Sequence, residues 1–218
     1  MSLFRLDASI HPATSASRAL ADLVEEQWTA EHPDAGVVRR DLAADPIPAT
    51  AWQLSVAAGA EPGDLTPEQA EAVALRTLLA DELVAAEALL FAVPLYNYGV
   101  SQHFKTWFDL AYTDPRTAPT STTLQGKPAT LVTVLGGNYG AGTPREGWDH
   151  STGWLRRVLA DVWGLELRVV QRPFTLVGVN PALDAFTDVA ATLKEHAEDG
   201  ARRSGVELAR ARSVRLAG

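Results

Sequence analysis

The chain has 218 residues, no cysteine and a formal net charge of −8, with 46% apolar and 21% charged residues. This length suits one α/β domain with a sizeable core. The acidic balance disfavours general binding to nucleic acid or anionic membranes, and the lack of cysteine excludes disulfides, thiolate metal sites and thiol nucleophiles. No basic segment precedes an apolar one at the N-terminus and no apolar run is long enough to span a bilayer, so we expect no signal peptide and a cytoplasmic protein.

Strand-like and helical segments alternate along the chain. We expect strands at residues 3–8, 37–41, 88–93, 129–135 and 165–174, and helices at residues 15–31, 66–87, 101–112, 149–164 and 182–208. Thr66, Pro67 and Gln69 have the pattern of a capping box, and the last helix is expected to break or bend near Gly200. Residues 44–64 are expected to form a proline-containing connector. The alternation predicts βαβ units with a parallel sheet in one domain.

A buried strand ends in a loop with an informative set of side chains. Residues 88–93 form an unbroken apolar run, typical of a strand covered on both faces. Pro94 ends this run, and the loop continues with Leu95, Tyr96, Asn97 and Tyr98. Open α/β sheets bind ligands at the carboxyl ends of their strands. Two rings and an amide there favour a flat heterocycle; the alternative is a structural loop whose tyrosines cover the sheet end.

The turn after the first expected strand is rich in hydroxyl groups. Residues 9–18 include Ser9, Ser15 and Ser17 and lead into a helix, whose free N–H groups and dipole attract phosphate. An ordinary helix cap by Thr14 or Ser15 is the alternative. The chain contains neither a G-x-G-x-x-G motif nor a Walker loop, so it lacks the Rossmann dinucleotide fingerprint.

A glycine-rich loop follows the fourth expected strand. Residues 136–142 contain four glycines, among them Gly136 and Gly137, which permit close approach of the backbone to a flat ligand. A flexible surface turn is the alternative. In a parallel sheet of order 2-1-3-4-5, the loops after strands one, three and four surround one switch point. We therefore expect the three loops to converge on one ligand.

The sequence indicates neither a metal site nor a catalytic base. The histidines lack the spacing of metal ligands. Asp149, His150 and Ser151 are consecutive, so they cannot contact one another as a catalytic triad, and Asp149 or Ser151 is expected to cap a helix. We therefore expect no metal ion and assign no catalytic residue.

The motifs also carry a family resemblance. The stretch Pro-Leu-Tyr-Asn at residues 94–97 precedes a helix that contains Lys105, Trp107, Phe108 and Asp109. Further marks are the serine turn, Arg40-Asp41-Leu42, Pro46-Ile47-Pro48, Leu65-Thr66-Pro67, Gly126-Lys127 and Gly136-Gly137. Together, over almost the whole chain, they resemble the family of FMN-dependent NADH:azoreductases and NAD(P)H:quinone reductases.

The resemblance implies a flavodoxin-like α/β fold. This is a three-layer sandwich in which helices cover both faces of a five-stranded parallel sheet of order 2-1-3-4-5, in a single FMN-binding domain over residues 1–218. It implies non-covalent FMN, NADH or NADPH as electron donor, and two-electron ping-pong transfer to a quinone, an azo compound or a similar flat acceptor. It also implies a homodimer with the active site at the subunit interface.

The same resemblance assigns the cofactor site by position. The implied phosphate contacts are Ser9, Ser15, Ala16 and Ser17. The implied ring contacts are Pro94, Leu95, Tyr96, Asn97 and Tyr98, with the Asn97 amide near the pyrimidine edge. The implied contacts along the ring edge from the other side are Val134, Leu135, Gly136 and Gly137.

The chain departs from the family pattern at three places. Relatives often carry a polar residue at the position of Ala16, and Ser-Arg at the positions of Val134 and Leu135. The loop at residues 113–123 is short and lacks the aromatic residue that often covers the flavin. These differences bear on the range of acceptors, azo dyes in particular. Two other functions stay open: a non-enzymatic flavodoxin-like electron carrier, and a scaffold that does not bind FMN.

Overall fold

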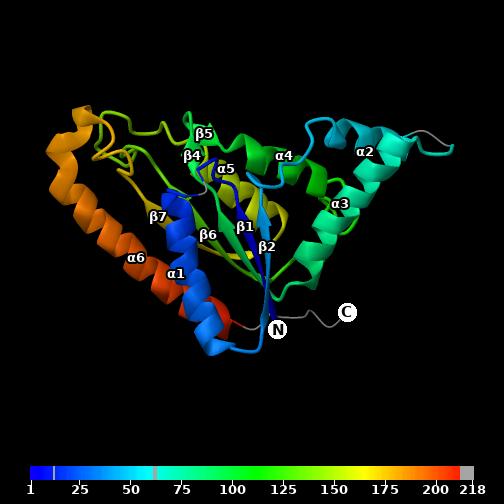
Figure 1. The fold of residues 1–218 in the computed structure, drawn as a ribbon, viewed down its shortest axis with the longest axis horizontal. Helices are drawn as coiled ribbons and strands as arrows, with labels where there is room; N and C mark the ends of the chain where they lie inside the picture. The colour runs from blue at the N-terminus through cyan, green and yellow to red at the C-terminus, as the bar shows by residue number, and fades with distance from the viewer. Residues whose placement is uncertain (12, 61–62, 212–218) are drawn as a thin grey trace.

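The computed structural model describes residues 1–11, 13–60 and 63–211. Pro12 in the hydroxyl-rich turn and Pro62 in the expected connector lie outside the described residues. Strands and helices alternate along the described chain, and the helices pack on both faces of one sheet (Figure 1). The predicted α/β class is confirmed.

Five parallel strands form the central sheet. They are β1 (Ser2–Asp7), β2 (Gly36–Asp41), β3 (Ala88–Ala92), β6 (Pro128–Val134) and β7 (Glu166–Arg172). Their order, β2-β1-β3-β6-β7, is the predicted 2-1-3-4-5 arrangement, because β4 and β5 form a separate hairpin. In register, Leu6 lies beside Phe91, which lies beside Leu131. The middle strand β3 is buried along its whole length, as its unbroken apolar run predicts.

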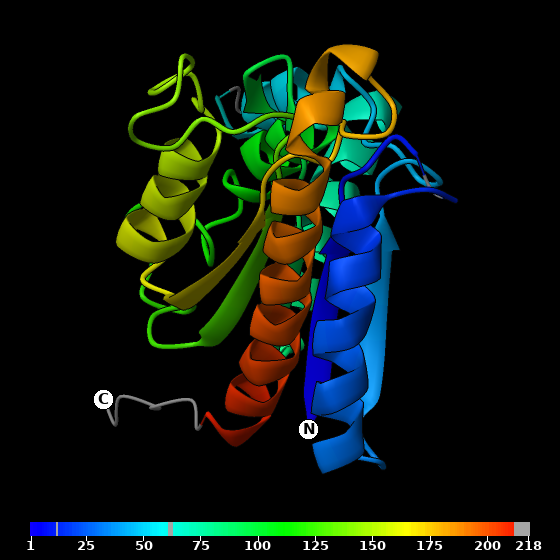
Figure 2. The same cartoon turned by 90° about the vertical axis from the view of Figure 1, so that its left-hand side faces the viewer.

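Two groups of helices enclose the sheet. One face is covered by α1 (Ala16–Glu31) and α6 (Thr187–Arg210), which lie side by side (Figure 2). The other face is covered by α2 (Ala51–Ala60), α3 (Pro67–Ala85), α4 (Gln102–Ala111) and α5 (Thr152–Arg156). Successive side chains of a strand point to opposite faces, so Phe91 and Leu90 enter different cores. Each face of the sheet therefore has its own apolar layer.

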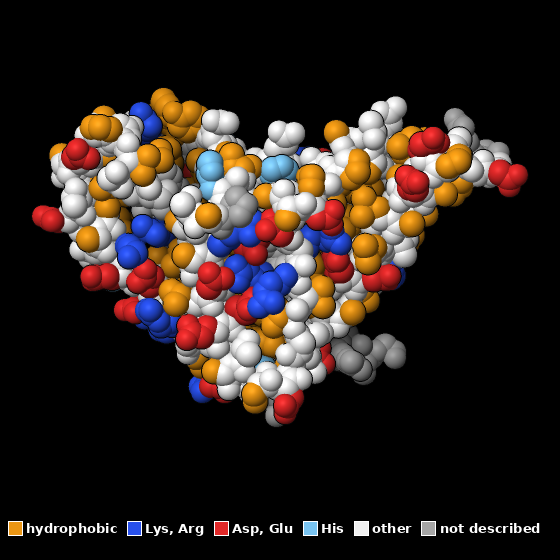
Figure 3. All heavy atoms as spheres, viewed as in Figure 1, with side chains coloured by type: hydrophobic (Ala, Val, Ile, Leu, Met, Phe, Trp, Pro, Cys, Tyr) orange, Lys and Arg blue, Asp and Glu red, His pale blue; other side chains and the backbone are white. Residues whose placement is uncertain are grey.

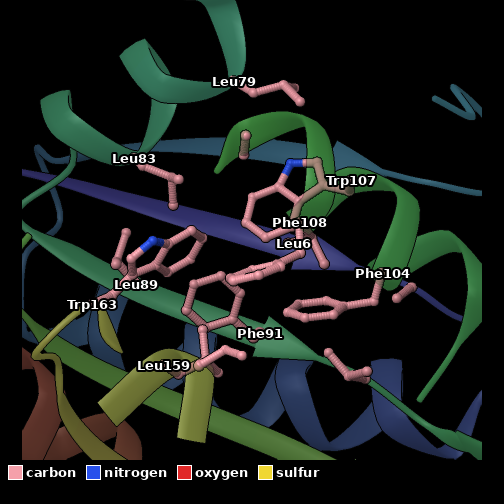
Figure 4. Packing of buried hydrophobic residues seen from close by; sticks show 14 of the residues in the cluster. Leu6, Leu79, Leu83, Leu89, Phe91, Phe104, Trp107, Phe108, Leu159 and Trp163 are labelled. Atoms are coloured by element: carbon pink, nitrogen blue, oxygen red, sulfur yellow. The ribbon is translucent and has the colours of Figure 1, made fainter. Parts of the chain in front are cut away.

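Aromatic rings dominate the core beneath α4. The ring centroid of Phe91 lies 6.3 Å from that of Phe104 and 6.1 Å from that of Trp107, in edge-on and tilted arrangements (Figure 4). Such geometries are favourable for aromatic pairs. These contacts fix the start of α4, and with it the segment that connects β3 to α4.

The capping box at the start of α3 is confirmed. The Thr66 hydroxyl accepts the N–H of Gln69 at 3.2 Å, and the Gln69 side chain accepts the N–H of Thr66 at 2.9 Å. At the other end of α3, the Lys127 ammonium group donates to the carbonyl oxygens of Leu83, Val84 and Ala86 at 2.6–2.9 Å. A cation there also interacts favourably with the helix dipole.

Two expectations about helix boundaries in the second half of the chain are wrong. The expected helix at residues 149–164 becomes the short α5 followed by a π-helical segment (Arg157–Val162). The expected helix at residues 182–208 begins with a 3-10 segment (Pro181–Phe186) and then runs through Gly200 as one helix. The break is absent because packing against α1 and the sheet holds this part of α6 together.

The expected connector at residues 44–64 is also corrected, because it contains α2. The segment 51–60 is rich in alanine, which has the highest helix propensity. The prolines at positions 46 and 48 precede the helix and do not interrupt it. The apolar side chains of α2 do not follow a clear helical period, so the pattern alone did not indicate a helix.

Gly205 allows α6 to approach α1 closely. A Cβ atom at this position would overlap the carbonyl oxygen of Val24 and lie 2.8 Å from Cβ of Gln27. The Nε2 atom of His32, just after α1, lies 2.8 Å from the carbonyl oxygen of Ala209. The backbones of the two helices are therefore close at Gly205 and Val24, and the His32 side chain links their C-terminal ends.

Replacing Gly205 with alanine is expected to lower the free energy of unfolding by about 1–3 kcal/mol, because the backbone of α1 must move away. Gly200→Ala is the matched control on the same helix. Its Cβ would meet only Val170 Cγ1 at 3.9 Å, so it is expected to be neutral or stabilising by up to about 1 kcal/mol. Urea unfolding of both variants measures the difference, and equal stabilities would contradict this account of the helix contact.

Candidate functional site

A cavity of about 560 Å³ opens at the carboxyl ends of β1, β3, β6 and β7. All three loops singled out from the sequence contribute to its wall. The predicted site residues in the wall are Ser9, Ser15, Ala16, Pro94, Leu95, Tyr96, Asn97, Tyr98, Val134 and Gly136. The structure thus brings the hydroxyl-rich turn, the aromatic–amide segment and the glycine-rich loop around one space.

Three predicted site residues do not line this cavity. The Ser17 side chain is fully buried, and its hydroxyl lies 3.0 Å from that of Ser15. Leu135 is also buried, and its carbonyl oxygen accepts the N–H of Thr175 at 3.0 Å. Gly137 lies against the ring of Tyr139. Any part that Ser17 has in binding an anion would therefore come from its backbone.

The start of α1 presents free N–H groups beside the cavity. Ser15 is the N-cap, and its hydroxyl accepts the N–H of Arg18 at 3.2 Å. Its carbonyl oxygen accepts the N–H of Ala19 at 3.1 Å. The N–H groups of Ala16 and Ser17 have no acceptor among the residues that the structure describes. Unpaired donors and the positive end of a helix dipole suit this position to an anion.

The Arg18 side chain connects the turn before α1 to the end of β2. It forms two hydrogen bonds of 2.6 Å with the Asp41 carboxylate and a longer one of 3.4 Å with the carbonyl oxygen of Ser9. The hydrogen bonds from Arg18 hold the pKa of Asp41 below its usual range. Because Asp41 stays ionised, it balances the charge of Arg18, and the helix terminus supplies the local attraction for an anion.

The Tyr96 hydroxyl joins the first loop to the second. It lies 3.1 Å from the Ser9 hydroxyl and accepts the N–H of Ile10 at 3.2 Å. The Ser9 hydroxyl in turn accepts the N–H of His11 at 3.2 Å. The tyrosine therefore connects the aromatic–amide segment to the hydroxyl-rich turn before α1.

That segment is a tight hairpin, where the sequence predicted a loop. β4 (Leu95–Tyr96) pairs antiparallel with β5 (Gly99–Val100). The two residues between them, Asn97 and Tyr98, have φ angles of 49° and 66°. Positive φ at both central positions is the mark of a type I′ turn. Asn97 tolerates this conformation better than most residues, and the turn leaves both side chains exposed.

The glycine-rich loop passes close to the segment that follows β7. A Cβ atom at Gly136 would lie 2.7 Å from Cδ1 of Leu176, which also lines the cavity. The N–H of Leu176 donates to the carbonyl oxygen of Gly136 at 3.1 Å. Because Gly136 has no side chain, the glycine-rich loop can contact the segment after β7, and no side chain at this position narrows the cavity.

Several residues of the wall were not assigned from the sequence: His11, Thr14, Tyr139, Arg145, Thr175, Leu176 and Val179. Thr175, Leu176 and Val179 follow β7, so the rule that selects loops at the carboxyl ends of strands also applies to them. Tyr139 belongs to the glycine-rich loop. Nothing in the spacing of the sequence indicates that Arg145 turns toward the cavity.

The described part of the chain shows neither a metal site nor a membrane-spanning helix. Within those ranges, no group of three or more His, Cys, Asp or Glu residues is placed to hold a metal ion. In the same ranges, no helix combines the length and the apolar character that crossing a bilayer requires.

A family model described as a flavodoxin-like fold matches residues 1–199. The chain belongs to the flavodoxin-like family. A relative from Frankia alni, named an FMN-dependent NADH:quinone oxidoreductase, is 43% identical over 190 residues, which cover 86% of this chain and 90% of the relative. One of the same name from Streptomyces avermitilis is 37% identical over 209 residues, covering 95% and 96%.

Solved structures of other flavodoxin-like proteins have the same fold. An azoreductase from Bacillus anthracis superposes with a TM-score of 0.78 at 20% identity, covering 94% of this chain and 99% of the other. An FMN-dependent NADH-azoreductase from Bacillus anthracis, in complex with FMN, superposes with a TM-score of 0.71 at 17% identity, covering 94% and 99%. At these identities the likeness concerns the fold alone.

Proposed function

We propose that this protein is an FMN-dependent oxidoreductase that transfers two electrons from NADH or NADPH to a quinone, an azo compound or a similar flat acceptor. The observation that carries the proposal is the cavity, which joins an anion-binding helix terminus to an aromatic–amide hairpin. The names of the relatives at 37–43% identity support the same activity. The proposed donor and acceptor would take turns at one site, as ping-pong transfer requires.

The residues present fit FMN. The cavity volume of about 560 Å³ lies within the range of about 300–1,000 Å³ that is usual for ligand sites. The free N–H groups at the start of α1 suit a phosphate, and the exposed rings and amide of the hairpin suit a flat heterocycle. FMN carries both groups, so one ligand would satisfy both ends of the cavity.

Each part of the wall has a role in this proposal. The Ser15 region, with the N–H groups of Ala16 and Ser17, holds the phosphate. The hairpin from Leu95 to Tyr98 holds the isoalloxazine, and Gly136 lets the backbone approach its edge. When bound, FMN supplies the two-electron chemistry, while the protein orients it and sets its polarity. No side chain is assigned as a catalytic acid or base.

Two substitutions of Asn97 distinguish the role of its side-chain amide from the role of its backbone conformation. Asn97→Gly keeps the positive φ angle but removes the amide, so FMN affinity is expected to fall about fivefold for one lost hydrogen bond. Asn97→Ala is expected to lose the same affinity and about 1 kcal/mol of stability as well, because alanine is strained in this conformation. Fluorescence titration with FMN and urea unfolding measure the two effects. Unchanged affinity in both variants would place the amide away from the ring edge.

We also propose one domain, a cytoplasmic location where NADH is supplied, and a homodimer with the active site at the interface.

Hydrophobic side chains gather over α2 and α3 (Figure 3), and Trp52, Val56 and Leu78 are about half exposed there. A second depression of about 550 Å³ shares His11, Tyr96 and Asn97 with the cavity and extends it toward the start of α4. The cavity is therefore open on the side of α4, and we propose that a partner subunit covers this opening. Analytical ultracentrifugation of the wild type and Trp52→Glu tests the dimer.

The decisive experiment is an absorbance spectrum of the purified protein after addition of FMN and removal of the excess. We expect a flavin band, and anaerobic titration with NADH is expected to bleach it, with recovery on addition of a quinone. A bound flavin that NADH does not reduce would favour an electron carrier. A protein that retains no FMN would overturn the proposal.

A further inference from the structure

Arg145 is a cation in the wall of the cavity, in a chain whose net charge is −8. It forms no ion pair with any residue that the structure describes, whereas arginines such as Arg5, Arg18 and Arg40 are paired with carboxylates. The described wall of the cavity contains no aspartate or glutamate. The charge of Arg145 therefore remains available to a ligand.

Aromatic contacts hold Arg145 near the hairpin. Its guanidinium carbon lies 5.8 Å from the ring centroid of Trp148, within the range of a cation–π contact. The Trp148 ring meets Tyr98 edge-on at 5.4 Å, and Tyr98 meets Tyr139 in the same way at 6.1 Å. The N–H of His150 also donates to the carbonyl oxygen of Tyr98 at 3.0 Å. The loop that carries Arg145 is thus tied to the turn proposed to hold the isoalloxazine.

The acidic neighbours of Arg145 in the sequence are engaged elsewhere. The Glu146 carboxylate accepts the N–H of Gly142 at 2.8 Å, which closes the glycine-rich loop on itself. One oxygen of Asp149 accepts the N–H groups of Ser151 and Thr152 at 2.9 Å and so caps the helix that follows. Among the described residues, neither carboxylate forms an ion pair with Arg145.

We propose that Arg145 is a specificity residue that favours ligands with an anionic group next to a flat ring. This inference rests on the proposed function, because the flat ring is the donor or acceptor that stacks beside the flavin. Two ligands of the reaction have this chemistry: the nicotinamide dinucleotide, through its diphosphate, and an acceptor that carries a sulfonate or a carboxylate. Arg145 belongs to the loop after β6, whereas the proposed phosphate site is at the start of α1.

The test compares the variants Arg145→Gln and Arg145→Lys with the wild-type holoenzyme in each half-reaction. For the acceptor, 1,4-naphthoquinone-2-sulfonate is compared with uncharged 1,4-naphthoquinone. For the donor, flavin reduction by NADH is compared with reduction by 1-benzyl-1,4-dihydronicotinamide, which lacks phosphates. Arg202→Gln is the matched control, since Arg202 lies on α6 and pairs with Asp199 at 3.3 Å, away from the cavity.

We expect Arg145→Gln to lower kcat/KM or the reduction rate about fivefold for the charged member of at least one pair, and to leave the uncharged member unchanged. Lysine should restore most of the loss, and added salt should shrink it. A loss confined to the sulfonated quinone identifies the acceptor as the source of the anion, and a loss confined to NADH identifies the donor. Equal losses for charged and uncharged ligands, no loss in either pair, or a weakened affinity for FMN would overturn the proposal. A wild-type protein that retains no FMN would instead refute the proposed function itself.

Discussion

Ser15→Asp is expected to weaken FMN binding about 100-fold without lowering the stability of the fold. Aspartate is as good an N-cap as serine, and its charge interacts favourably with the helix dipole. The same charge would lie beside the proposed phosphate. Two unit charges 4 Å apart repel by about 4 kcal/mol at an effective dielectric constant of 20, and solvent around this half-buried position reduces that figure.

Ser15→Asn is the matched control, because it caps equally well and adds no charge. Its FMN affinity is expected to stay within a few-fold of the wild type, measured by fluorescence titration. Thermal unfolding of the FMN-free proteins should show that Ser15→Asp is at least as stable as the wild type. Tight FMN binding by the stable aspartate variant would mean that the phosphate does not lie at the start of α1.

Arg5→Leu is expected to destabilise the protein by about 3–5 kcal/mol, because it leaves a buried carboxylate without its partner. Arg5 and Asp7 are both 4% exposed, and two hydrogen bonds of 3.0 and 3.1 Å join their side chains. Arg5 also donates to Asp22 at 2.6 Å. Arg5 and Asp7 both lie on β1, and Asp22 lies on α1, so this cluster joins the strand to the helix.

The destabilisation should depend on pH. Burial raises the pKa of Asp7 above its usual value, even though Arg5 lowers it. A carboxyl whose pKa is raised by folding contributes most to the free energy of unfolding at low pH. This contribution is lost as the pH rises through the folded-state pKa. Without Arg5 the pKa of Asp7 rises further, so the penalty in Arg5→Leu should be smaller at pH 5 than at pH 8.

Arg39→Leu is the control for this prediction. Arg39 is exposed, and its partner Glu25 also accepts a hydrogen bond from Arg5, so the loss of Arg39 is expected to change the free energy of unfolding by less than about 1 kcal/mol. The double variant Arg5→Leu with Asp7→Leu should recover much of the lost stability, because neither charge is then buried. A single Arg5→Leu variant that unfolds like the wild type at pH 8 would show that Asp7 does not depend on this pair.

The sheet could be predicted because its signals are local. The unbroken apolar run at residues 88–93 is typical of a central strand. The capping box at Thr66 marks the start of α3 within one residue. The helix α2 was missed because its alanines follow no apolar period. The continuous α6 depends on packing against α1, a contact between distant parts of the chain that no local pattern around Gly200 reveals.

The site could be predicted to the level of loops but not of side chains. The carboxyl ends of parallel strands select the turns after β1, β3 and β6, and all three line the cavity. The hairpin was missed because Asn97 is followed by tyrosine, not by the glycine that commonly marks a type I′ turn. Ser17 and Leu135 point into the protein, and Arg145 points to the cavity. Such directions depend on tertiary contacts that spacing does not encode.

The contact between α1 and α6 has a consequence for synthesis of the protein. The buried side of α1, including Leu20, Val24 and Trp28, is completed by residues near the end of the chain, such as Ala201 and Leu208. A ribosome makes the first helix long before the last one, so the part of this stripe that α6 covers stays exposed until late in synthesis. Packing of α1 is thus completed only after α6 has been made, and chains cut before α6 would expose this stripe to chaperones and proteases.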